Sequence, residues 1–124
     1  MAHRLYHHKL KKCVPLLTEA EFKSITPHLQ SYLNEMRKYK RTRGWPAEAA
    51  RAYQDAGEKA MDAYEEIAGE RLDHPEQLFT VRLAHFGRLC PECGKPFRIP
   101  HAKLCAECGY ALPDGEVAGP ISET

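Results

Sequence analysis

The amino-acid sequence predicts a small, mainly α protein of the α+β class, with a short N-terminal β-hairpin and a four-cysteine segment near the C-terminus. Three observations support this prediction. Two short runs typical of strands flank a basic turn near the N-terminus. Apolar residues then recur at helical spacing through the middle of the chain. Finally, two CxxCG motifs lie close together, at residues 90–94 and 105–109.

Length and composition are those of a single domain with an appended lobe, because 124 residues of which 43% are hydrophobic allow a modest core. No apolar run is long enough to span a membrane, and the N-terminus has His and Lys where a signal peptide needs apolar residues. An odd thiol, Cys13, accompanies the two CxxC pairs, which is unusual in a secreted protein. We therefore expect a cytoplasmic protein with no membrane partner.

The charge is unevenly distributed although the net charge is only +1. Residues 1–43 carry ten basic and three acidic side chains, whereas residues 44–86 carry four basic and nine acidic ones. This asymmetry indicates either a charged partner or the packing of one half of the chain on the other. The sequence leaves both explanations open.

The N-terminal residues predict a β-hairpin. The runs 4–8 and 13–17 flank the basic turn 9–12. Pro15 confines the second run to an edge, because proline has no N–H to donate to a neighbouring strand. Neighbouring residues of a strand point to opposite faces, so His7 and the histidine after it do not form a two-point metal clamp.

The first predicted helix begins at a capping box. In this motif Thr18 and Glu21 satisfy each other's backbone N–H groups, which starts a short helix. Thr26 as N-cap and Pro27 as first helical residue then predict a restart. Gly44 is expected to end this second helix.

Two further helices are expected. Residues 47–68 follow a turn that contains the single tryptophan, Trp45, and Gly57 is a candidate point of division. The acidic residues of this stretch are interpreted as a solvated face, since nothing in the sequence buries or pairs them. Asp73 then caps a last helix, which Gly87 ends just before the cysteines.

The two CxxCG motifs are the clearest functional signal. A two-residue gap lets both sulfurs of one motif reach one metal ion, and the following glycine permits a positive-φ turn. The predicted ligands of one closed tetrahedral site are Cys90, Cys93, Cys105 and Cys108. Soft sulfur ligands in this geometry select Zn²⁺ or iron. Disulfides are a further alternative, but they need an oxidising compartment.

These motifs resemble the zinc-ribbon family, in which two CxxCG knuckles at the tips of paired hairpins clamp one zinc ion. The resemblance covers residues 89–111, and the whole chain resembles small bacterial zinc-ribbon proteins, which implies this architecture but no activity. Rubredoxin-like iron sites share the pattern but have more aromatic neighbours than Phe97 and Tyr110. The expected division is a helical body with the hairpin (1–87), a zinc ribbon (88–112) and a disordered tail (113–124).

A basic cluster is predicted at the end of the first long helix. It consists of Arg37, Lys38, Lys40, Arg41 and Arg43. Such a cluster is typical of a nucleic-acid or anion site. Basic residues at the C-terminal end of a helix also offset the helix dipole, and this explains their position without a nucleic acid.

The leading functional hypothesis is a non-enzymatic zinc-ribbon protein that acts as a protein–protein interaction module. A shell of four thiolates leaves no open position for a substrate, and no other catalytic set is visible. The alternative is a module that binds DNA or RNA through the ribbon and the basic cluster. An enzyme that uses Cys13 or the histidines is a third hypothesis.

Overall fold

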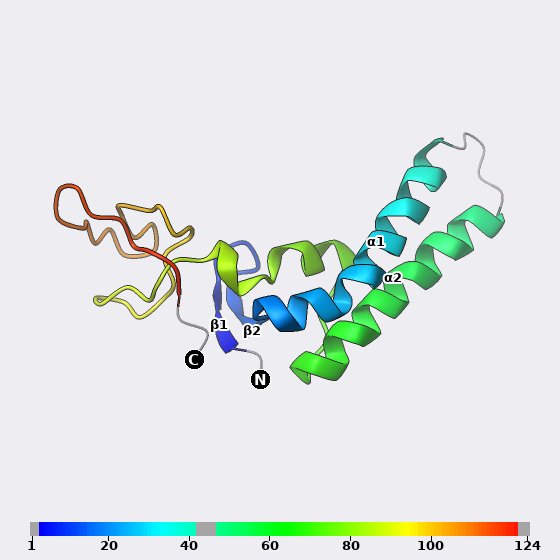
Figure 1. Ribbon diagram of the computed structural model, residues 1–124, viewed down its shortest axis with the longest axis horizontal. Helices are drawn as coiled ribbons and strands as arrows, with labels where there is room; N and C mark the ends of the chain where they lie inside the picture. Colours follow the sequence, from blue (N-terminus) through cyan, green and yellow to red (C-terminus); the bar gives the residue numbers. More distant parts are fainter. Residues whose placement is uncertain (1–2, 42–46, 122–124) are drawn as a thin grey trace. The chain divides into compact units, whose positions relative to one another are not determined.

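The computed structural model confirms the predicted small α+β class and describes residues 3–41 and 47–121. No helix among these described residues is long and apolar enough to cross a membrane. The chain forms, in order, β1 (His3–His7), β2 (Lys12–Leu16), α1 (Glu19–Arg41), α2 (Ala47–Ala68) and the 3₁₀ helices η1 (Pro75–Thr80) and η2 (Leu83–His85) (Figure 1).

The chain is divided into two compact units. The terminal unit combines Met1–Glu19 with Val81–Thr124, and the helical unit comprises Ala20–Thr80. This division differs from the predicted boundaries at residues 87 and 112, because the hairpin groups with the cysteine segment instead of with the helices. The hairpin therefore belongs to the surroundings of the cysteines.

The predicted hairpin is confirmed. Strands β1 and β2 pair antiparallel, with His3 opposite Leu16 and His7 opposite Lys12. Lys11 closes the turn with a left-handed φ of 56°, and its N–H donates to the carbonyl of His7 at 2.7 Å. The register buries one face of the hairpin, including Leu16, and leaves Cys13 exposed.

Helix α1 is continuous, so the predicted restart at Thr26 is wrong. The Thr26 hydroxyl donates to the carbonyl of Phe22 at 2.9 Å, which is a bond inside a helix and not an N-cap. Pro27 lies inside α1, where it lacks the N–H for an i→i−4 hydrogen bond. The helix bends between its first turns and its last ones (Figure 1), as expected of a helix with an internal proline.

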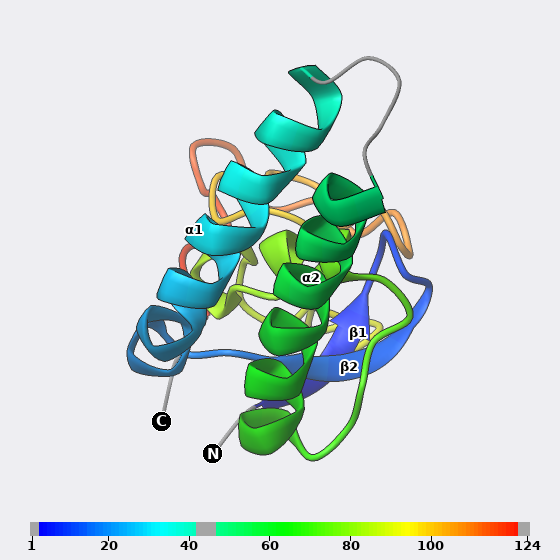
Figure 2. The same ribbon diagram turned by 90° about the vertical axis from the view of Figure 1, so that its right-hand side faces the viewer.

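Helix α2 runs undivided through Gly57 and lies beside α1 (Figure 2). A Cβ at Gly57 would come within 3.0 Å of the Pro75 ring and 3.2 Å of the Tyr32 ring, so this glycine permits close packing and does not break the helix. Tyr32 and Tyr53 join the two helices, with ring centroids 5.2 Å apart and hydroxyl oxygens 3.1 Å apart. The turn predicted at residues 44–46 lies outside the described residues.

The helix predicted from Asp73 to Gly87 is also wrong, because two short 3₁₀ helices replace it. Backbone pairing with Leu17 interrupts the helical path. The N–H of Leu17 donates to the carbonyl of Val81 at 2.7 Å, and the N–H of Leu83 donates back to the carbonyl of Leu17 at 2.8 Å. This pairing ties the chain after the hairpin to the chain before the cysteines.

Most of residues 113–121 are exposed, and this segment contacts the rest of the terminal unit at Ala118 and Gly119. Ala118 is buried, and its N–H donates to the carbonyl of Ala102 at 2.9 Å. The N–H of Gly119 donates to the carbonyl of Pro100 at 2.7 Å. Residues 122–124 lie outside the described residues.

Replacement of Gly87 by alanine is expected to destabilise the protein by about 1 to 3 kcal/mol, as measured by urea unfolding. A Cβ at this position would lie 2.7 Å from the backbone oxygen of Ile99 and 2.8 Å from the Cβ of Phe97. Gly57→Ala is the matched comparison and should cost less, because its contacts are 3.0 Å or longer and a gain in helix propensity of about 1 kcal/mol offsets part of their cost. Equal destabilisation by the two substitutions would contradict this packing.

Candidate metal centre

The cysteine segment is built from a ten-residue repeat. Residues 88–97 (RLCPECGKPF) and 103–112 (KLCAECGYAL) share the same residue at five of their ten positions. In each copy the last residue donates its N–H to the carbonyl of the first at 2.9 Å. Antiparallel bridges join Leu89 to Pro96 and Leu104 to Ala111, so each copy is a minimal hairpin. The sequence signal extends beyond the knuckles to these flanking positions.

A tight turn closes the tip of each hairpin. The N–H of Gly94 donates to the carbonyl of Cys90 at 2.9 Å, and the N–H of Gly109 donates to that of Cys105 at 2.7 Å. The two glycines have φ values of 77° and 84°, a region in which a Cβ is strained. The positive φ predicted from the CxxCG motifs is thus confirmed.

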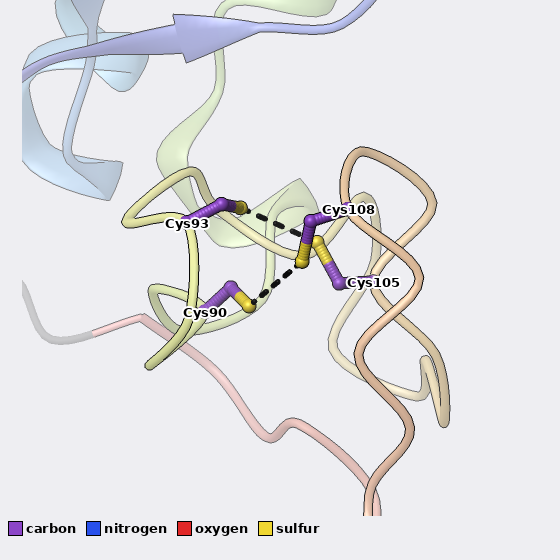
Figure 3. A group of neighbouring side chains, drawn as sticks. All are labelled: Cys90, Cys93, Cys105 and Cys108. Atoms are coloured by element: carbon purple, nitrogen blue, oxygen red, sulfur yellow. Dashed lines mark hydrogen bonds between the residues drawn. The ribbon is translucent and has the colours of Figure 1, made fainter.

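The two turns bring four sulfur atoms together, all within 4.8 Å of one another (Figure 3). The contacts between Cys90 and Cys108 and between Cys93 and Cys105 both measure 3.6 Å. A tetrahedral site with metal–sulfur bonds of about 2.3 Å has sulfur–sulfur edges of about 3.8 Å. The arrangement therefore fits one four-coordinate metal ion, and none of the five cysteines is in a disulfide.

Each turn buries its first cysteine and exposes its second. Cys90 and Cys105 are 2% and 0% exposed, whereas Cys93 and Cys108 lie at the surface. The buried pair shares a small core with Phe97, Leu112 and Ala118. The metal site and the hydrophobic core of this segment are therefore one structure.

The surroundings of the four thiols favour a thiolate at one position and a protonated thiol at another. Burial raises the pKa of Cys90, but the N–H groups of Cys93 and Glu92 and the thiols of Cys108 and Cys105 outweigh it and lower that pKa to about 7. The N–H of Tyr110 lowers the pKa of Cys108, but burial and the three neighbouring thiols raise it to about 12. Four thiolates therefore need a cation between them.

The four cysteines complete the shell without a histidine. They are the only group of at least three His, Cys, Asp or Glu side chains that the described residues bring within metal-binding distance. His85 and His101 are exposed. A closed shell of four sulfurs leaves no position for an activated water or a substrate.

Side chains of the hairpin, the two repeats and Arg98 make contacts near the cysteines that sequence reasoning missed. The ammonium of Lys95 lies 4.2 Å from the ring centroid of Tyr6, and Arg98 Nε donates to Glu107 Oε1 at 2.9 Å. Burial and the nearby charge of Arg98 lower the pKa of His8. No local pattern joins residues 6–8 to residues 95–107, so only the folded chain reveals these contacts.

The predicted basic cluster lies elsewhere, in the helical unit. Arg37, Lys38, Lys40 and Arg41 are exposed near the end of α1, and Arg43 lies outside the described residues. Lys38 Nζ is 3.4 Å from Glu35 Oε1. A role of this cluster in nucleic-acid binding stays a prediction.

Comparisons with protein-family models, curated proteins and solved structures gave no match to this chain. The assignment of the metal centre therefore rests on geometry. The four clustered cysteines fit a zinc-binding knuckle motif.

Loss of one buried cysteine is expected to abolish metal binding and to disorder residues 88–112. A structural zinc site contributes on the order of 10 kcal/mol to folding, which a segment with so small a core cannot replace. Metal content and amide NMR spectra of Cys90→Ser and Cys105→Ser test this expectation. Cys13→Ser is the matched control and should keep both metal and spectrum. A full metal equivalent in Cys90→Ser would contradict the assignment.

Metal affinity is expected to fall as the pH falls. The raised pKa values of Cys93 and Cys108 mean that these thiols hold protons at neutral pH when no cation is present. Binding must release those protons, so acid opposes binding and alkali favours it. Titration of the protein with Zn²⁺ near pH 7 should release about two or more protons per ion. An affinity independent of pH between about 6 and 8 would contradict thiolate ligation.

Proposed function

We propose that the protein is a non-enzymatic zinc-ribbon protein in which a structural Zn²⁺ site holds a protein-binding surface in shape. The ligands are Cys90, Cys93, Cys105 and Cys108. Their soft sulfur atoms and near-tetrahedral spacing support zinc. Iron is the less favoured ion, because rubredoxin-like iron sites have more aromatic neighbours than the two found near the shell in sequence, Phe97 and Tyr110. The ion supplies a cross-link between the two repeats and no reaction chemistry.

The observation that supports protein binding is a set of exposed aliphatic side chains on the terminal unit. The large hydrophobic residues that the described part of the chain exposes most are Leu89 (44%), Ile99 (53%), Leu104 (52%) and Val117 (44%). Leu89 and Leu104 occupy the same position in the two repeats, directly before the first cysteine. Zinc ligation would therefore fix where both leucines lie.

These side chains suit a protein better than a nucleic acid. Each square ångström of apolar surface removed from water gains about 25 cal/mol, and another protein offers the apolar surface that this gain requires. The odd number of cysteines, five, supports a reducing, cytoplasmic setting for the interaction. Both the partner class and the location belong to this proposal.

The leucine pair is tested by capture of partners from the native host with wild-type and variant protein. Leu89→Ser combined with Leu104→Ser should abolish capture and leave metal content unchanged. The matched control is Arg88→Ser with Lys103→Ser, which alters the preceding position of each repeat and should keep the partner. Binding of the purified partner then has to show the same dependence on the leucines. Undiminished binding by the leucine variant would contradict the proposal.

A second candidate function is nucleic-acid binding through the ribbon and the basic cluster at residues 37–43. It is supported by four cations exposed near the end of α1. Their proximity to the C-terminal end of the helix dipole is the competing explanation. Titrations with labelled nucleic acids separate this cluster from a second basic surface, on the N-terminal hairpin.

A further inference from the structure

The N-terminal hairpin is a basic surface without acidic residues. Residues 1–18 contain Arg4, Lys9, Lys11 and Lys12 and neither Asp nor Glu. All four cationic side chains are exposed. Three of them lie in or next to the turn between β1 and β2, within four residues of chain. The hairpin therefore presents concentrated positive charge to solvent.

The first cysteine repeat extends this surface. Lys95 lies over the ring of Tyr6, which lies on β1 between Arg4 and the turn. Arg98 is close enough to His8 for its charge to contribute to the lowered pKa of that histidine. The rings of His7 and Phe86 also meet edge to face, with centroids 5.3 Å apart. These contacts place two further cations, Lys95 and Arg98, beside residues of the hairpin.

Acidic groups of the terminal unit offset only part of this charge. Glu107 is paired with Arg98, and Glu19 is paired with Arg82 through bonds of 2.6 Å and 2.7 Å. The remaining described acidic residues of the unit are Glu92, Asp114 and Glu116. Lys, Arg, Asp and Glu side chains give the terminal unit +3, from nine basic and six acidic residues, and the helical unit −2, from nine and eleven. Four thiolates around the proposed Zn²⁺ would lower the charge of the terminal unit to about +1, but they add no negative charge to the hairpin turn itself.

We propose that the hairpin turn and the adjoining first cysteine repeat bind the phosphate backbone of a nucleic acid. The surface consists of Arg4, Lys9, Lys11, Lys12 and Lys95. Lysines are flexible point charges, so they suit contacts with phosphates and provide no bidentate recognition of bases. The binding is therefore independent of sequence and strongly dependent on salt.

This surface differs from the cluster at the end of α1 and is independent of the exposed leucines. The inference gives the candidate nucleic-acid function a different location, on the unit that holds the metal centre. Failure of the protein-binding proposal would leave it intact. Failure of the hairpin surface would likewise leave the leucine pair untouched.

The test is fluorescence anisotropy with three labelled probes: single-stranded RNA and single-stranded DNA of about 12 nucleotides, and duplex DNA of about 12 base pairs. Each probe is titrated in about 20 mM and in about 200 mM salt. The hairpin variant combines Lys9→Gln, Lys11→Asn and Lys12→Gln. Asparagine is chosen at position 11 because it tolerates the φ of 56° found there. The matched control combines Arg37→Gln, Lys38→Gln and Lys40→Gln, so both variants lose three positive charges.

We expect the wild type to bind at least one of the three probes. Comparison of the three affinities identifies the preferred kind of nucleic acid. The hairpin variant should bind at least about tenfold more weakly at low salt, and its salt slope on a single strand should fall by about 2. The control should change affinity by less than about threefold. Metal content and amide spectra establish that both variants are folded, and shifts of the wild-type amides at residues 9–12 on binding provide a second measurement.

Three results would overturn the inference. No binding of any probe by the wild type at low salt would remove the site. Equal losses in the two variants would show an effect of net charge alone. A larger loss in the α1 control, with amide shifts at residues 37–41 instead of 9–12, would move the interaction to the helical unit.

Discussion

Convergence of four cysteine sulfurs is the constraint on which the terminal unit depends. The four thiols cannot all ionise side by side, because burial and the three neighbouring thiols raise the pKa of Cys108. Backbone N–H groups aimed at the sulfurs relieve part of this repulsion, and a divalent cation removes the rest. The proposed zinc ion therefore links protonation, ligand geometry and folding in one site.

Other features of the cysteine segment follow from the small size of its core. The two repeats pair internally through short bridges and contribute only a few buried side chains beside the cysteines. So small a core rarely folds without a cross-link or metal. Additional support comes from Gly87, which lets Phe97 and the backbone near Ile99 approach closely, and from Ala118, which is buried in the same cluster as the cysteines. The positions of surface residues such as Leu89 depend on this packed segment.

Sequence alone predicted features that depend on local chemistry. The CxxCG turns need two cysteines and a positive-φ glycine, and the hairpin needs two short runs around a turn; the structure confirms both. Features that depend on distant contacts were missed. The backbone of Leu17 pairs with the segment after Thr80 and prevents a last helix. The N–H of Ala118 donates to the carbonyl of Ala102. Thr26 and Pro27 form a capping pattern, yet packing carries α1 through both residues.

The central claim is that four sulfur atoms hold one metal ion, and X-ray absorption spectroscopy of the metal-loaded protein tests it most directly. The predicted result is a single shell of four sulfur ligands at about 2.3 Å from zinc, unchanged in Cys13→Ser. A shell with nitrogen or oxygen ligands at about 2.0 Å would contradict the claim, because it would bring a histidine, a carboxylate or water into a site that the cysteines should close.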